Sequence, residues 1–578
     1  MSDLKTVLIN DSRIEDISGE IGFAINGGAS QATYSPQQAN TSSNTSHSWN
    51  INVPSENIVV DRRVLIDSDV TFTITVTNVP IGSVAFNWGN TDGFGPYPLN
   101  SMYLTQNAII NNCGLSVNTQ DIIAPLLRMN DQKIHTYYDG WTPSMVDDTY
   151  YNYSDAVNTN NNPLGTVNNN GMDNKLKPRG CHTITSMSVV YTTGGVVTPF
   201  TTFVSTATSD KWVITLVTHF TEPILFLSPF ISNPCVSNEA GFLGINNLTF
   251  NFTIDTSLRR VFRSSNAWAS STTYALSNAT SSGSAFSGLR MLMNYLSVQP
   301  SQYAKISARN VLPLLQYDRY IANASSTTSS VAGGTTASYT SSNIALNQVP
   351  DTILIFARVP VTQQIASNSD SFFQINKISV NFNNVSGILS SATPYELWVL
   401  SQKAGSSQSW SEFSGQINTS STTGLSNTIP TTGSILALQP AYCFNLPDYL
   451  TNSSLGSYSL QFSLDITNQS SSSLPVEVVV ITITSGYIVT HNGTTSSYTG
   501  IINKEICLSA KEGSSVPRIS QSDYERLVGG VRDNRGVMNM MKHFKNRRMS
   551  STSGGVMSGG VMSGGADSIG GRLGKYIR

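Results

Sequence analysis

Apolar and polar residues alternate along much of this chain with a period of two, which predicts β-strands that bury one face. Within residues 246–256, Leu248, Phe250, Phe252 and Ile254 alternate with Asn or Thr. Residues 459–467 repeat this pattern with Leu, Phe, Leu and Ile. Both segments predict strands with one side in a core and the other in water.

Further β-rich runs are separated by clusters of Gly, Pro and Asn, which are typical of turns. They predict strands at 57–66, 70–79, 182–192, 212–220, 289–298, 312–321, 352–359, 373–382 and 476–489. One helix start is also clear, because Thr393 is followed by Pro394 and, three residues on, by Glu396. This capping box predicts a short helix that ends near Gly405.

Composition agrees with an all-β protein. Only 12% of the residues are charged, against about 25% in ordinary soluble domains. Ser, Thr, Asn and Gln supply the missing polarity, and Ser, Thr and Asn compete with helical hydrogen bonding. A chain of 578 residues also exceeds what one hydrophobic core usually supports, so two or three domains are expected.

An internal match relates the two halves of the chain. Residues 110–123 and 382–397 both show a strand end, an Asn-Asn turn, a Gly, a Leu-Ser pair in the same vicinity and then a Thr that opens a helix. The two segments lie about 270 residues apart, which suits a duplicated domain of jelly-roll size. Chance convergence of turn residues is the alternative. Duplication predicts two consecutive antiparallel eight-stranded jelly-roll sandwiches with short inserted helices.

These patterns predict a division of the chain into five parts. They are an N-terminal arm at 1–50, a first jelly roll at 51–260, a Ser/Thr/Ala/Gly-rich linker at 261–287, a second jelly roll at 288–510 and a basic Gly/Ser/Met-rich tail at 511–578.

The order and spacing of several segments resemble the double jelly-roll major capsid proteins of virophages and Polinton-like viruses, which are kin of those of adenoviruses and giant DNA viruses. The segments are 53–62 (VPSENIVVDR), 290–300 (RMLMNYLSVQP), 349–358 (VPDTILIFAR), 383–390 and 409–415. The similarity spans roughly residues 50–500.

The resemblance implies a structural protein that catalyses nothing and needs no cofactor. Three copies would form a capsomer of pseudo-hexagonal outline, and capsomers would tile an icosahedral shell together with minor capsid and penton proteins. The protein would be made in the host cytoplasm and would end in the virion. The alternative is a jelly-roll adhesin or another glycan-binding surface or fibre protein, and a third reading, a β-sandwich glycoside hydrolase, lacks a defensible pair of carboxylates.

The residues themselves predict no catalytic, cofactor or metal site. The six histidines have no metal-ligand spacing, and the five cysteines form no CxxC pair, so free thiols are expected. Asp147 and Asp148 lie in a Tyr-rich segment that fits a sugar or calcium site, or a loop packing on a neighbouring subunit. We expect no signal peptide and no membrane span, since the most apolar stretch, 212–230, is interrupted by polar residues and Pro.

The tail is the most distinctive segment chemically. From Arg526 to Arg578, ten Lys and Arg face two acidic residues, a charge of +8, so the rest of this chain of net charge −2 carries −10. Such a tail is expected to dock on the acidic body or to contact DNA weakly.

A short pattern recurs in this tail. Leu/Ile/Met-x-Gly-Gly-x predicts cleavage after Gly530, Gly560 and Gly565, because it resembles the recognition pattern of adenovirus-type cysteine maturation proteases. Two residues without side chains can thread a narrow cleft. A flexible linker is the alternative, and residues 25–28 fit the same pattern.

Overall fold

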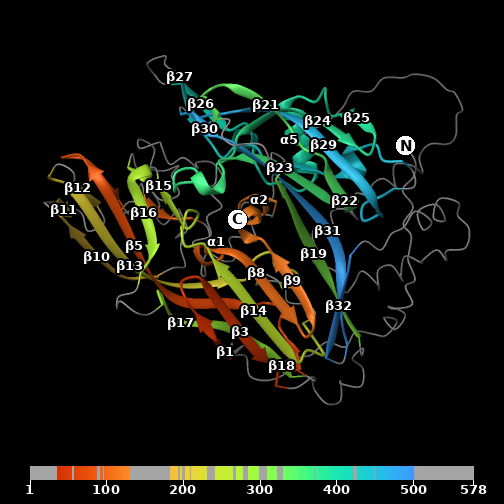
Figure 1. The fold of residues 1–578 in the computed structure, drawn as a ribbon, viewed down its shortest axis with the longest axis horizontal. Helices are drawn as coiled ribbons and strands as arrows, with labels where there is room; N and C mark the ends of the chain where they lie inside the picture. The colour runs from red at the N-terminus through yellow and green to blue at the C-terminus, as the bar shows by residue number, and fades with distance from the viewer. Residues whose placement is uncertain are drawn as a thin grey trace, which may run out of the picture. The chain divides into compact units, whose positions relative to one another are not determined.

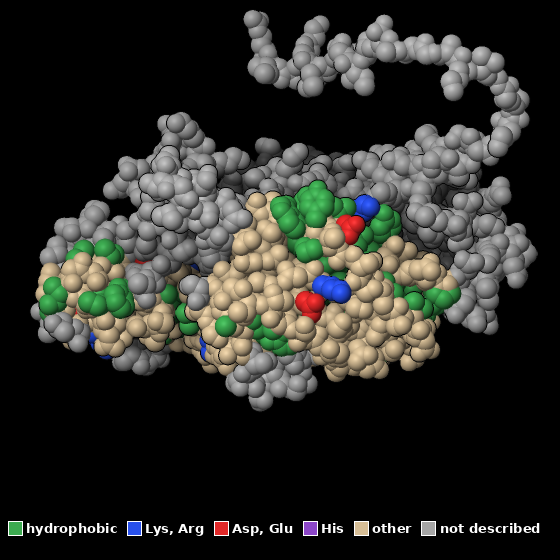
Figure 2. Space-filling model, turned by 90° about the horizontal axis from the view of Figure 1, so that it is seen from above, with side chains coloured by type: hydrophobic (Ala, Val, Ile, Leu, Met, Phe, Trp, Pro, Cys, Tyr) green, Lys and Arg blue, Asp and Glu red, His purple; other side chains and the backbone are tan. Residues whose placement is uncertain are grey.

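The computed structural model describes residues 35–499 except 55–57, 88–91, 96, 130–182, 193–194, 198–201, 208–209, 231–240, 265–267, 278–283, 298–308, 322–329, 370, 421–425, 448–449, 471 and 492. Gly530, Gly560, Gly565, Asp147 and Asp148 therefore lie outside the described residues. On the face seen in Figure 2, charged side chains are few, and hydrophobic side chains gather in patches.

The first half of the chain forms a sandwich of two antiparallel sheets (Figure 1). One sheet has the order β1-β17-β5-β13-β10, with β16 also paired to β5, and the other has the order β2-β3-β14-β8-β9. Their bounds are β1 Ser35–Gln38, β2 Thr41–Ser42, β3 Ser46–Asn52, β5 Leu65–Val79, β8 Tyr103–Ile110, β9 Cys113–Val117, β10 Thr183–Tyr191, β13 Asp210–Pro223, β14 Asn247–Ile254, β16 Thr272–Leu276 and β17 Phe286–Met293.

The second half forms another sandwich. Its sheets have the orders β19-β31-β23-β28, with β32 on β31, and β21-β29-β24-β25, with β22 on β29. Their bounds are β19 Arg309–Ile321, β21 Thr336–Thr340, β22 Ile344–Gln348, β23 Thr352–Arg358, β24 Gln374–Phe382, β25 Val385–Ile388, β28 Leu436–Leu438, β29 Leu455–Thr467, β31 Glu477–His491 and β32 Thr494–Thr499.

Short helices and strand pairs connect these sheets. The helices are α1 Pro98–Met102, α2 Thr119–Leu127, α5 Pro394–Lys403, α6 Trp410–Phe413, α7 Pro440–Cys443, and the 3₁₀ turns η3 Ala269–Ser271 and η4 Val361–Gln363. The small antiparallel groups are β4 Ile58–Val60 with β18 Tyr295–Ser297, β7 Asp92–Phe94 with β15 Phe262–Ser264, β6 Val84–Asn87 with β12 Thr202–Ser205 and β11 Gly195–Val197, β20 Ser330–Val331 with β30 Leu474–Pro475, and β26 Gln416–Ser420 with β27 Ser426–Pro430.

The two sandwiches share one strand order, which confirms the predicted double jelly roll. In the first sheet of each half, the strands correspond in order: β1, β17, β5 and β13 in the first half match β19, β31, β23 and β28 in the second. The same holds for β3, β14, β8 and β9, which correspond to β22, β29, β24 and β25. Helices α2 and α5 each follow the last strand of this second set. Short strands at the edges add to the four per sheet of an eight-stranded jelly roll.

The predicted alternation appears directly in the cores. Along β14, Leu248 and Phe250 are buried, whereas Asn251 and Thr253 are exposed. Strand β29 repeats this pattern from its fourth residue onward. Each large apolar side chain removed from water in this way contributes about 1.5–3 kcal/mol.

One sheet of the second sandwich is buried on both faces. In β23, Ile353 and Ile355 pack in the second core, whereas Leu354 and Phe356 join the apolar cluster that fills the first sandwich. Strand β31 divides its valines and isoleucines in the same way. A sheet covered on both sides needs an unbroken apolar run rather than alternation, which explains the sequence at 352–359.

The strand pairing differs from the predicted domain boundaries in two places. Strands β1 to β3 lie in the first sandwich although 1–50 was assigned to an arm, and β16 and β17 pair with β5 although 261–287 was assigned to a linker and 288 onward to the second roll. The physical reason is that β16 is a short edge strand whose residues alternate between half-buried and exposed, and two of its five residues are Thr. Its composition therefore resembles that of a linker.

The helix predictions agree with the structure. Thr393 caps α5 through the predicted capping box with Glu396, and α5 ends two residues before Gly405. Helix α2 opens at Thr119 as expected, but the hydroxyl of Thr119 donates to the carbonyl of Tyr103 (2.6 Å) instead of capping the helix.

Candidate functional site: the interface between the two sandwiches

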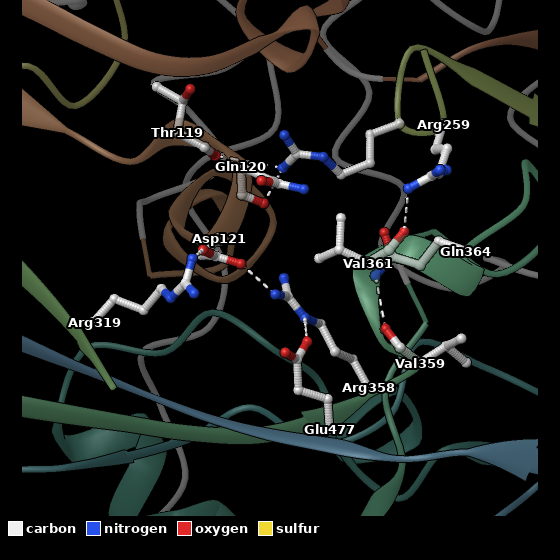
Figure 3. Close-up of polar contacts among 11 residues, drawn as sticks. Thr119, Gln120, Asp121, Arg259, Arg319, Arg358, Val359, Val361, Gln364 and Glu477 are labelled. Carbon is white, nitrogen blue, oxygen red and sulfur yellow. Dashed lines mark hydrogen bonds and ion pairs between the residues drawn. The ribbon is translucent and has the colours of Figure 1, made fainter. Parts of the chain in front are cut away.

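Helix α2 of the first sandwich presents the carboxylate of Asp121 to the second sandwich (Figure 3). Asp121 forms ion pairs with Arg358, at the end of β23, and with Arg319, on β19. Arg358 in turn donates from Nε to Oε2 of Glu477 on β31, at 3.2 Å. Because the Asp121 side chain is fully buried, this network is an internal junction rather than a surface feature.

The charges in this network compensate one another. Burial by itself disfavours the charged carboxylate of Asp121, but Arg358, Arg319 and Arg260 outweigh it and hold the pKa of Asp121 below its ordinary value. The first turn of α2 adds a favourable field, since helix N-termini stabilise negative charge. Asp121 is therefore ionised near neutral pH.

Two consecutive arginines of the first half, Arg259 and Arg260, donate hydrogen bonds at this interface. Arg260 donates to main-chain carbonyls of the first half, among them those of Thr119 and Ser101, at 3.4 Å each. Arg259 points the other way and donates to the carbonyl of Val361, at 2.6 Å, in η4 of the second half (Figure 3). The pair thus fixes α2 with one side chain and contacts the neighbouring sandwich with the other.

Hydrogen bonds extend the interface in both directions from Asp121. At the end of α2, the amide and the hydroxyl of Ser407 both donate to the carbonyl of Arg128, at 2.7 Å each. Elsewhere, the Asn111 amide donates to Thr495 (2.9 Å), and the Thr490 hydroxyl donates to the carbonyl of Leu243 (2.8 Å). Together with the apolar layer of β23 and β31, these bonds hold the two sandwiches together.

No pattern in the sequence predicts this network. Arg358 and Asp121 are 237 positions apart, and spacing along one chain gives no sign of such a pair. The only local signal was an acidic residue in the first turn of an otherwise apolar helix, which is costly unless a partner neutralises it.

The described histidines and cysteines include one buried ring and two free thiols. His47 is enclosed by Trp49, Tyr103 and Phe286, and burial lowers its pKa to about 3. Cys113 and Cys443 are free thiols. Within the described ranges, no three His, Cys, Asp or Glu side chains are grouped so as to hold a metal ion, and no helix is long and apolar enough to cross a bilayer.

This arrangement holds the two sandwiches together. Two consecutive jelly rolls of one strand order, joined through a buried and charge-compensated interface, define the chain as a double jelly-roll protein. Comparison with known proteins agrees. The family model described as Sputnik virophage major capsid protein 1st domain matches residues 2–296, and that of the major capsid protein V20 C-terminal domain matches residues 317–486.

The first of these models covers more than half of the chain, so the chain belongs to the Sputnik virophage major capsid protein family. The putative capsid protein V20 of Sputnik virophage is 27% identical over 540 residues, which are 91% of this chain and 84% of V20. The protein is accordingly a major capsid protein and a component of the virion, in a family that is structural and not enzymatic.

Solved structures show the same fold. The cryo-EM structure of the Sputnik virophage matches with a TM-score of 0.70 and 24% identity, covering 90% of this chain and 98% of the matched chain. The crystal structure of the mavirus major capsid protein matches with a TM-score of 0.59 and 15% identity, covering 90% and 100%.

Proposed function

We propose that three copies of this chain form a capsomer of pseudo-hexagonal outline and that these capsomers tile an icosahedral shell. The observation that carries the proposal is the identical strand order of two sandwiches held at a fixed buried junction. Three such chains supply six similar sandwiches, and a head-to-tail contact repeated by a rotation that closes gives a ring.

Light scattering during size-exclusion chromatography tests this proposal. We expect roughly three times the monomer mass, and hexagonal particles by electron microscopy. A soluble monomer at micromolar concentration overturns the proposal.

The domain organisation that supports this assembly is a first roll from residue 35 to about 297 and a second from residue 309 to about 499. The strand pairing supports this division because β17 and β18 still pair with β5 and β4. The segment before residue 35 and the basic tail at 511–578 lie outside the described residues.

Other proteins are required by the geometry of such a shell. A capsomer with six similar sides does not match the fivefold axes of an icosahedron. A separate penton protein therefore occupies the vertices, and minor capsid proteins join the capsomers. Assembly follows synthesis in the host cytoplasm.

We propose in addition that the basic tail is cleaved during maturation of the particle. Cleavage after Gly530, Gly560 or Gly565 by a cysteine protease would remove basic residues that first dock on the acidic body or contact packaged DNA weakly. Intact-mass spectrometry of purified virions decides this. A capsid protein that ends at Gly530 supports removal, whereas chains ending at Arg578 in infectious particles overturn it.

A further inference from the structure

Helix α5 and the neighbouring α6 expose a cluster of aromatic side chains, formed by Tyr395, Trp398 and Trp410. Tyr395 is 55% exposed and Trp410 37% exposed. Their rings contact one another, with centroids 5.1 Å apart for Tyr395 and Trp398 and 5.4 Å apart for Tyr395 and Trp410. Rigid aromatic side chains gathered at a surface are typical of protein interfaces.

Helix α2, the counterpart of α5 in the first sandwich, shows what a helix at this position contacts. Helices α2 and α5 occupy the same place in their sandwiches, and both carry an acidic residue at the third helical position, Asp121 in α2 and Glu396 in α5. Seven of the nine residues of α2 are buried, and Asp121 is buried against the second sandwich. In α5 only Leu397 and Ser401 are buried, and Tyr395, Glu396 and Lys403 are exposed.

The surface that corresponds to the one contacted by α2 also exists in the first sandwich. The network of Asp121 contacts β19, β23 and β31, which correspond to β1, β5 and β17, and β13 pairs with β5 beside them. On the outward face of β5, β13 and β17, Asp69, His219 and Arg290 have side chains 47%, 41% and 42% exposed. They meet around Asp67, which Arg290 contacts at 2.7 Å and His219 at 3.3 Å. We call this set the charged patch.

We infer that α5 and its aromatic cluster dock on the charged patch of a second copy of this chain, as α2 docks on the second sandwich within one chain. The inference rests on the proposed trimer and specifies which two surfaces form the contact between neighbouring chains. Repeating the contact three times in one direction closes the ring, with each α5 on the next chain.

The chemistry of the two surfaces suits this partner. Within the chain, the contact is permanent and includes an apolar layer, because Leu354 and Phe356 are fully buried in the folded protein beside the Asp121 network. Between chains, both surfaces must be soluble before assembly. Tyr395 and Trp410 beside the exposed Glu396 and Lys403 satisfy this need on α5, and the part-exposed Arg290 and Asp69 satisfy it on the charged patch.

A photo-crosslinking experiment on the full-length chain tests the inference. Benzoylphenylalanine replaces Tyr395, the oligomeric state is measured by light scattering, and dimer-sized crosslinked bands are analysed by mass spectrometry. We expect a trimer whose crosslinks join residue 395 to peptides of β5, β13 or β17. A trimer that crosslinks elsewhere, or only within one chain, overturns the docking surface and leaves the proposed function standing. An unsubstituted chain that is monomeric overturns both.

A dilution series adds a quantitative test. Tyr395→Ser should raise the trimer dissociation constant at least tenfold. Ile81→Ser is the matched control, because Ile81 is 61% exposed at the turn after β5, outside both surfaces. Equal circular dichroism spectra establish that both variants fold. An unchanged dissociation constant for Tyr395→Ser contradicts the inference.

Discussion

At the centre of the interface, the carboxylate of Asp121 is held between the guanidinium groups of Arg358 and Arg319. Asp121→Asn should lower the free energy of unfolding by about 3–5 kcal/mol, because both arginines lose their buried counter-charge. Chemical denaturation measures this change. Asp465→Asn is the control, since Asp465 accepts from Ser338 at an exposed position, and should change stability by less than about 0.5 kcal/mol. Equal effects of the two substitutions would contradict the role of the network.

The stabilisation from Asp121 has a definite pH dependence. Its pKa in the folded protein is lowered, so the folded state binds the proton less readily than the unfolded state. The contribution is fully present above the ordinary pKa of the carboxyl group and is lost as pH falls through the lowered value. The Asp121→Asn variant should lack this loss of stability at acidic pH.

Glu222 has the opposite effect on the pH dependence of stability. Its carboxylate is buried and accepts from the amides of Leu99 and Asn100, at 2.9 and 3.0 Å, but burial raises its pKa from 4.5 to about 7. The folded state therefore binds more protons than the unfolded state between these values, and stability falls as pH rises from about 4.5 to 7.

Glu222→Gln should remove this loss. The difference in unfolding free energy between pH 5 and pH 7.5 should shrink by roughly 2–3 kcal/mol relative to the unsubstituted protein. Denaturation at the two pH values measures it. If the two proteins show the same pH dependence, Glu222 does not titrate in this range.

At the scale of the element, the loop that leads into β28 passes unusually close to the start of β24. Gly433 has φ +95°, and a Cβ at this position would lie 2.0 Å from the carbonyl oxygen of Phe372. Gly433→Ala should therefore destabilise the protein by more than about 2 kcal/mol. Gly114→Ala in β9 is the control, since a Cβ there meets nothing within 4 Å. Thermal unfolding compares the two, and similar midpoints would disprove the close approach.

The elements themselves could be predicted well from the sequence. Local sequence is enough to predict the strands β14 and β29 and the start of α5 at Thr393. Alternation and helix capping both involve residues only a few positions apart. Strand β16 could not be predicted, because none of its residues is fully buried and its conformation depends on pairing with β5. The Asp121 network could not be predicted either, since its partners come from four separate elements.

At the scale of the described double roll, the apolar cluster that fills the first sandwich continues into the second. It includes Leu354, Phe356, Val479 and Ile481 from the sheet that is buried on both faces. Neither sandwich can unfold alone without exposing this layer to water, which costs about 25 cal/mol for each Å² of apolar surface.

The two sandwiches should therefore unfold together. Differential scanning calorimetry is expected to show one transition, with a van't Hoff enthalpy equal to the calorimetric enthalpy. Phe356→Ala should lower the midpoint of this single transition, because the cavity it leaves weakens both sandwiches at once. Two resolved transitions in the unsubstituted protein would contradict this coupling. The buried layer would then be a contact between independent domains, and the fixed junction on which the pseudo-hexagonal arrangement depends would be lost.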